Sequence, residues 1–154
     1  MTGLDPASGA TVLGFDVGSR RIGVAAGSSF GMGGRAVAVV QVHSGAPDWA
    51  HIDRLRQEWL PQALIVGDPI TLDDGDQPAR KRAQRFARQL RERYRVPVLL
   101  VDERSSSREA ARRFAGDRAE GRRRRRDGAL LDADAAAIIV ERWMQAPEDA
   151  VPLP

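Results

Sequence analysis

An alternation of apolar and small or polar positions marks residues 11–18 and predicts a β-strand. Because side chains in a strand point to alternate faces, one face holds Leu13, Phe15 and Val17, and the other holds Gly14, Asp16 and Gly18. Glycines inside a strand usually mark a place where a ligand or another backbone comes close. We therefore predict that Asp16 is displayed to a ligand. The alternative is an edge-strand acid paired with Arg20 or Arg21.

Beyond this strand, helical periodicity alternates with short apolar runs. The pattern predicts strands at 21–26 and 36–42, a helix at 48–60 capped by Asp48, a strand at 63–66, a helix at 78–95, a strand at 96–101, a short helix at 106–114 and a last helix at 129–145. Apolar strands separated by helices are typical of parallel strands covered on both faces. The predicted fold class is therefore α/β, with a mixed five-stranded sheet of three antiparallel strands followed by two parallel ones, flanked by helices. This order matches the ribonuclease-H-like layout.

The length of 154 residues is enough for one compact domain. We predict a single domain at 11–145, preceded by a flexible lead at 1–10 and followed by a tail at 146–154. The absence of cysteine excludes disulfides and thiolate metal sites, and no apolar run reaches the ~20 residues of a membrane helix. With an opening that lacks the features of a signal peptide, the sequence predicts a cytoplasmic protein that does not contact membranes, either a monomer or a weak homodimer.

Arginine carries almost all of the positive charge, because Lys81 is the single lysine among 24 cationic residues. The planar guanidinium suits bidentate contacts to phosphate, which favours a nucleic-acid partner, although a coding bias toward arginine would give the same composition. The run at 122–126 is more specific, because five consecutive like charges repel and seldom pack. The basic side of the helix at 78–95 is either a solvated face or a second contact surface for RNA.

Three acids are predicted to meet at one edge of the sheet. Glu103 follows the last parallel strand, where ligands of such sheets bind, and Asp132 lies in the first turn of the last helix, opposite Asp16. Carboxylates held this close repel one another unless a cation neutralises them, and oxygen-only ligands suit Mg²⁺ or Mn²⁺. Asp102 and Glu103 could instead cap the next helix, and Asp134 competes with Asp132 for the same position.

Four sequence blocks carry a resemblance to a known family. They are residues 14–25, residues 65–69 together with 76–78, residues 101–104, and residues 131–136. In this order and spacing they resemble the YqgF/RuvX type of ribonuclease-H-like proteins, described as nucleases of the precursor of small-subunit ribosomal RNA. The chain departs from the family pattern at Asp68, where leucine is common, at Ser106 and Ser107, where threonines are common, and near Asp132, where a lysine is common.

The resemblance implies catalytic and metal-binding roles for Asp16, Glu103 and Asp132, and a Mg²⁺- or Mn²⁺-dependent nuclease that acts in 5′-end processing of precursor 16S ribosomal RNA. Predicted contacts to the nucleic acid are Arg20, Arg21, Arg104, Arg122, Arg123, Arg124, Arg125 and Arg126. The sequence leaves open whether Asp68, Asp102 or Asp134 also contributes. It also leaves open resolution of Holliday junctions in branched DNA, and a non-catalytic role as an RNA-binding ribosome-assembly factor.

Overall fold

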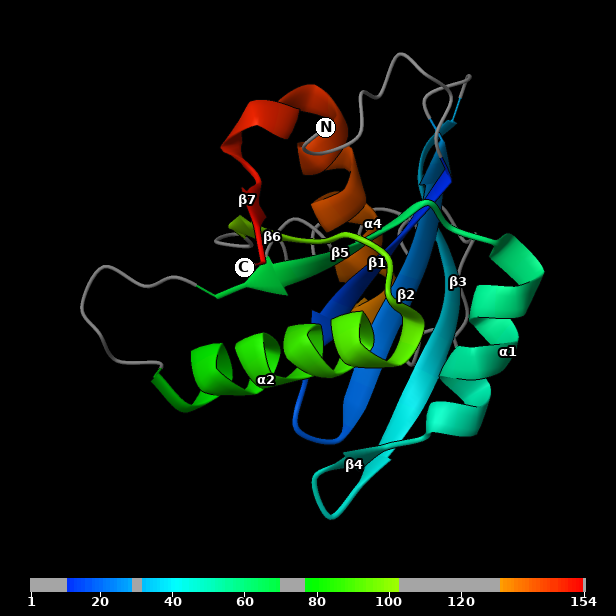
Figure 1. Ribbon diagram of the computed structural model, residues 1–154, viewed down its shortest axis with the longest axis vertical. Helices are drawn as coiled ribbons and strands as arrows, with labels where there is room; N and C mark the ends of the chain where they lie inside the picture. The colour runs from blue at the N-terminus through cyan, green and yellow to red at the C-terminus, as the bar shows by residue number, and fades with distance from the viewer. Residues whose placement is uncertain (1–10, 29–31, 70–76, 103–130, 154) are drawn as a thin grey trace, which may run out of the picture.

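The computed structural model describes residues 11–28, 32–69, 77–102 and 131–153 (Figure 1). The elements are β1 (Thr11–Val17), β2 (Arg21–Ser28), β3 (Met32–His43), β4 (Ala46–Pro47), α1 (Trp49–Trp59), β5 (Ala63–Asp68), α2 (Gln77–Tyr94), β6 (Val98–Asp102), α4 (Leu131–Gln145), a 3₁₀ helix (Pro147–Asp149) and β7 (Val151–Pro152). The predicted helix at 106–114 lies outside the described residues, as does the lead at 1–10. The other predicted helices and strands are present, with ends shifted by a few residues.

The strands form one mixed sheet in the order β4-β3-β2-β1-β5-β6-β7. β1, β2 and β3 pair antiparallel, whereas β5 and β6 continue the sheet in parallel with β1. The predicted combination of three antiparallel and two parallel strands is therefore confirmed, together with the α/β class. The predicted number of five strands is wrong, because the described part of the chain contains seven.

The two additional strands, β4 and β7, are two residues long and lie at the two edges of the sheet. β4 pairs with the end of β3, and β7 pairs with Leu99 and Leu100 of β6. A two-residue strand is too short to show an alternating pattern, since it is defined by its partner and not by its own sequence. As a consequence, the predicted tail contributes a strand to the sheet, and Leu153 N donates to the Val98 carbonyl at 2.9 Å.

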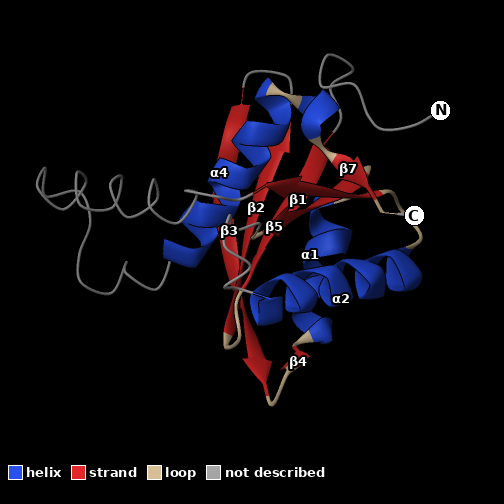
Figure 2. Cartoon of the chain, turned by 90° about the vertical axis from the view of Figure 1, so that its left-hand side faces the viewer, coloured by secondary structure: helices blue, strands red, loops and turns tan. Residues whose placement is uncertain are grey.

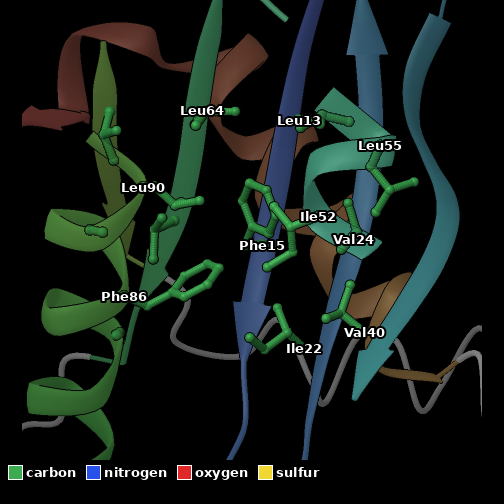
Figure 3. Packing of buried hydrophobic residues seen from close by; sticks show 14 of the residues in the cluster. Leu13, Phe15, Ile22, Val24, Val40, Ile52, Leu55, Leu64, Phe86 and Leu90 are labelled. Atoms are coloured by element: carbon green, nitrogen blue, oxygen red, sulfur yellow. The ribbon is translucent and has the colours of Figure 1, made fainter. Parts of the chain in front are cut away.

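Helices cover both faces of the sheet, with α1 and α2 on one face and α4 on the other (Figure 2). The α1/α2 face carries the larger cluster, in which Phe86 of α2 meets Phe15 of β1 edge-on, with ring centroids 5.3 Å apart (Figure 3). Asp48 caps α1 as predicted, because its carboxylate accepts a hydrogen bond from His51 N at 3.2 Å. The strand alternation predicted for β1 is confirmed, because Leu13 and Phe15 lie in this cluster.

An ion pair and a phenol connect α1 to α2. Arg93 Nε and Nη2 donate to the two carboxylate oxygens of Asp53, at 2.8 and 2.6 Å, and the Tyr94 hydroxyl donates to the same carboxylate at 2.6 Å. The hydrogen bonds from Arg93 and from Tyr94 lower the pKa of Asp53 to about 2. The loss of the proton from Tyr94 is disfavoured by burial and by the neighbouring carboxylate, which raise its pKa.

Candidate active site at the carboxyl end of β1

Asp16 is the penultimate residue of β1, the strand at the centre of the sheet. It pairs with Gly23 of β2 and is partly buried. Alternation along β1 puts its side chain on the same face as Val12 and Gly14, which is the face that α4 covers. Asp16 makes interactions within the fold, so it is not an isolated surface charge.

Gly14, two residues before Asp16, and glycines of the neighbouring strands mark the close approach of α4. A Cβ atom built on Gly14 would clash with Cγ2 of Val140, and a Cβ atom built on Gly27 would clash with Cγ1 of the same valine. At Gly34 a Cβ atom would clash with the backbone of Ala137. At Gly14 the space that a side chain would need is therefore taken by Val140 of α4, and at Gly34 it is taken by the backbone of the same helix.

These contacts also give the direction of α4. At the level of Gly27 the helix presents Val140 and Met144, and two residues further along β1, at Gly14, it presents Ala136 and Val140. Contacts therefore move about one turn toward the start of α4 for each two residues of β1, because a helical turn rises ~5.4 Å and two strand residues ~6.6 Å. One further step puts the first turn of α4, which includes residue 132, level with Asp16.

Only part of the predicted trio of acids lies within the described residues. Asp16 is described in full, the backbone of Asp132 lies in α4, and the side chain of Asp132 lies outside the described residues, as does Glu103. Glu103 directly follows Asp102, the last residue of β6. Among the side chains that the structure describes, no group of three His, Asp or Glu residues is close enough to hold a metal ion. The convergence of the three carboxylates stays a prediction.

Asp68 is the last residue of β5 and lies beside Asp102 of β6. It is at the carboxyl end of its strand, as Asp16 is in the parallel strand β1. Its side chain lies on the other face of the sheet. Every second residue of a strand shares a face, and Leu64 and Val66 of the same strand pack into the α1/α2 cluster. There Asp68 is only 5% exposed and forms an ion pair with Arg80 of α2, with Nε and Oδ1 3.2 Å apart. This contact gives Asp68 a structural partner on the face opposite Asp16.

Two other acids, which the sequence left open, are held within the fold. Asp134 is 9% exposed in α4 and makes interactions there, and the backbone carbonyl of Asp102 accepts a hydrogen bond from Arg142 at 3.2 Å. α4 is buried around its whole circumference from residue 133 to residue 140. Helical spacing alone therefore did not separate a sheet-facing aspartate from a solvent-facing one.

The predicted nucleic-acid contacts are only partly described. Arg20 and Arg21 lie exposed in and after the β1–β2 turn, close in sequence to Asp16. Their carbonyls are used by the fold, because Arg21 O accepts from Gly18 N and Arg20 O accepts from Val42 N, both at 2.9 Å. Their guanidinium groups thus extend from a fixed backbone. Arg104 and the run Arg122–Arg126 lie outside the described residues.

Solved structures share this arrangement of helices and strands. The fold is similar to that of a structure described as "T. thermophilus RuvC in complex with Holliday junction substrate", with a TM-score of 0.54, 18% identity, and coverage of 94% of this chain and 99% of the other. A second structure of RuvC from Thermus thermophilus gives a TM-score of 0.51 at 19% identity, with 93% of this chain covered. The molecule therefore has a ribonuclease-H-like fold.

Sequence relatives identify the family. The model of the family described as "RuvX: Holliday junction resolvase" matches residues 10–146. A protein of Xanthomonas campestris named "Putative pre-16S rRNA nuclease" is 68% identical over 145 residues, which are 94% of each chain. A protein of the same name from Xanthomonas axonopodis is 68% identical over 144 residues, 94% of this chain and 93% of its own. The chain belongs to the RuvX family, and the resemblance seen in the four sequence blocks is confirmed. Among the described helices, none is both long and apolar enough to cross a bilayer.

Proposed function

We propose that this chain is a metal-dependent nuclease that hydrolyses phosphodiester bonds in the 5′-end processing of precursor 16S ribosomal RNA. The family and the names of its relatives support a hydrolase that acts on nucleic acid. The observation that carries the proposal is Asp16, a partly buried carboxylate on the central strand, on the face that α4 approaches through Gly14. Placing an acid there, at the sheet edge where ligands bind, has a cost in desolvation that a bound cation offsets.

The proposed ligand set is Asp16, Glu103 and Asp132. These groups offer only oxygen atoms, which fits Mg²⁺ or Mn²⁺ and not a thiolate metal. When bound, such ions activate the attacking water and stabilise the leaving oxygen of a phosphodiester. The chain itself contributes position: β1 fixes the carboxylate of Asp16, and the exposed Arg20 and Arg21 bind the phosphates on either side of the scissile bond.

The test is the Asp16→Asn variant, which keeps the shape of the side chain and removes its charge. We expect cleavage of a labelled precursor RNA with Mn²⁺ to fall about 100-fold or more, since even changes to groups behind the ligands cost 10–100-fold. Asp48→Asn is the matched control, because the same substitution at the cap of α1 retains a good N-cap on the face of the sheet opposite Asp16. Thermal unfolding followed by circular dichroism verifies that both variants fold.

Calorimetry with Mn²⁺ in the absence of RNA provides a readout that does not depend on activity. The ion should bind wild type and Asp48→Asn equally and bind Asp16→Asn more weakly. If Asp16→Asn cleaves RNA as fast as the Asp48 control, the catalytic assignment is wrong. If wild type binds RNA but never cleaves it, the non-catalytic alternative replaces the proposal.

A second candidate substrate is branched DNA, which the description of the family as Holliday junction resolvases favours. Both activities would use the same carboxylates, so the substitutions above do not separate them. Comparing the rates of cleavage of a four-way DNA junction and of the precursor RNA, at equal concentrations and with the same metal, distinguishes the two. The proposal requires the RNA to be cleaved faster.

A further inference from the structure

A cavity of about 400 Å³ opens next to the candidate active site, on the opposite face of the sheet. It lies between the end of β1, the β1–β2 turn, the β3–β4 turn and the first half of α2. Its lining is Val17, Gly18, Ser19, Ile22, Val42, Gly45, Pro47, Pro78, Lys81, Arg82, Arg85, Phe86 and Gln89. Val17 follows Asp16 directly, so the last two residues of β1 turn one side chain to each face.

The floor of this pocket is apolar and firmly held. Val17, Ile22 and Phe86 pack into the α1/α2 cluster, and Figure 3 shows Ile22 and Phe86 close to the end of β1. The ring of Phe86 is fixed from two sides, because it meets Phe15 edge-on and stacks against Trp49 with ring centroids 5.6 Å apart. Phe86 and Ile22 are buried and support the floor from below, and the partly exposed Val17 and Val42 form the surface onto which a flat apolar group can pack.

The rim of the pocket is cationic. Lys81, Arg82 and Arg85 project from α2, and none of the lining residues that the structure describes is an acid. Among the described residues none of the three forms a salt bridge, in contrast to Arg80, which is paired with Asp68. Three cations that have no ion pair within the described part of the chain, beside an apolar floor, are complementary to a ligand that joins an anion to an aromatic ring.

We infer that this pocket binds one nucleotide of the RNA chain, with the base on the apolar floor at Val17 and Val42 and a phosphate at Lys81 and Arg85. The inference rests on the proposed function, since RNA supplies the anion and the ring together. A volume of about 400 Å³ is at the lower end of the range for small-ligand pockets, which suits one nucleotide. An RNA strand that passes around the β1–β2 turn would meet Asp16 on one face and the pocket on the other.

The first test compares two arginines of the same helix. Both arginines are exposed, but Arg85 lines the pocket and Arg88 does not. Binding of a short fluorescein-labelled oligouridine is measured by anisotropy in EDTA, so that no cleavage occurs. Arg85→Ala should weaken binding about tenfold. It should also reduce the slope of log K against the logarithm of the salt concentration by ~0.7, the value for one contact to a phosphate of a single strand. Arg88→Ala should change neither.

The second test adds a negative charge at the rim. Gln89 is exposed and lines the pocket, and Gln57 is exposed on α1 away from it. Gln89→Glu should weaken binding of the oligouridine several-fold, whereas Gln57→Glu should leave it unchanged. Equal effects at 85 and 88, together with equal effects at 89 and 57, would overturn the inference and indicate that α2 attracts RNA only through its overall charge.

Comparing uridine 5′-monophosphate with ribose 5-phosphate distinguishes the contribution of the base from that of the phosphate. Comparing the mononucleotide with the oligouridine distinguishes a free nucleotide from the RNA chain. The inference requires the mononucleotide to bind wild type more tightly than the sugar phosphate does. If Arg85→Ala weakens the mononucleotide but not the oligouridine, the pocket serves a free nucleotide and the assignment to RNA is wrong. The proposed nuclease function is tested separately by Asp16→Asn. If Asp16→Asn abolishes cleavage but Arg85→Ala leaves RNA binding unchanged, only the assignment of the pocket is wrong.

Discussion

Val140 offers a direct test of how α4 is seated on the sheet, because its two methyl groups lie over two glycines of neighbouring strands. Cγ2 occupies the space where Gly14 would carry a Cβ atom, and Cγ1 does the same at Gly27. Introducing a methyl group at Gly14 should therefore force Val140 and the helix outward. Overpacking of this kind costs about 1–3 kcal/mol of the free energy of unfolding.

Truncating Val140 removes the obstacle and carries a cost of its own. Val140→Ala deletes two buried methyl groups, worth about 1.6 kcal/mol of transfer free energy before any cavity cost. If the two substitutions acted independently, the double variant would lose roughly 3–5 kcal/mol. Because the new methyl group at Gly14 fills the space that Val140→Ala vacates, we expect Gly14→Ala/Val140→Ala to be more stable than this sum by about 0.5–3 kcal/mol.

Gly34 gives the control, since its clash is with the backbone oxygen, carbonyl carbon and Cα of Ala137. No side-chain truncation relieves a backbone contact, so Gly34→Ala/Val140→Ala should be close to additive. Urea unfolding of the five variants and wild type measures all terms, and thermal unfolding should shift by ~2–4 °C per kcal/mol in a chain of this size. Additivity at Gly14, or equal coupling at Gly14 and Gly34, would refute the proposed seating of α4.

Two further predictions concern ion pairs. The pKa of Asp53 is lowered to about 2 by Arg93 and Tyr94, so the stabilisation it provides is complete above the unfolded value near 4 and is lost as the pH falls from about 4 to about 2. The difference in melting temperature between wild type and Asp53→Asn should be ~2–4 °C at neutral pH, since both carboxylate and guanidinium are about two-fifths exposed, and should shrink across that window. At the buried Asp68, Arg80→Met should cost about 1–3 kcal/mol in urea unfolding, because it leaves a carboxylate without its cation, whereas Asp68→Leu should cost less. A greater loss for Asp68→Leu would contradict this account of the pair.

The longer helices and strands could be predicted from sequence, because each carries a local signal. The alternation in β1, the Asp48 cap and the apolar stripe of α2 all depend on neighbours within a few residues. β4 and β7 could not be predicted, because a two-residue strand is defined by hydrogen bonds to residues elsewhere in the chain. The same limit applies to the pocket beside Val17, which three separate segments of the chain build.

The candidate site was predicted in the same uneven way. The sequence singled out Asp16 because a charge between glycines contradicts the apolar pattern around it, and the structure places Asp16 near the carboxyl end of the central strand. The role of Gly14 stayed open in the sequence, since the helix that approaches it lies more than a hundred residues further along the chain. Asp68 stayed open for a similar reason, because only the packing of α2 brings Arg80 to it.

The end of β1 shows how one alternation can divide two tasks. Because Gly14 has no side chain, α4 can pack closely on the sheet there. This close packing brings the first turn of α4 level with Asp16, two residues further along the same face of β1. Val17, on the other face, belongs to the floor of the pocket. A larger residue at position 14 should therefore impair metal binding at Asp16 by lifting α4, while it leaves the α2 pocket and its affinity for a nucleotide intact. Loss of both properties in a folded Gly14→Ala protein would show that the two faces do not act separately.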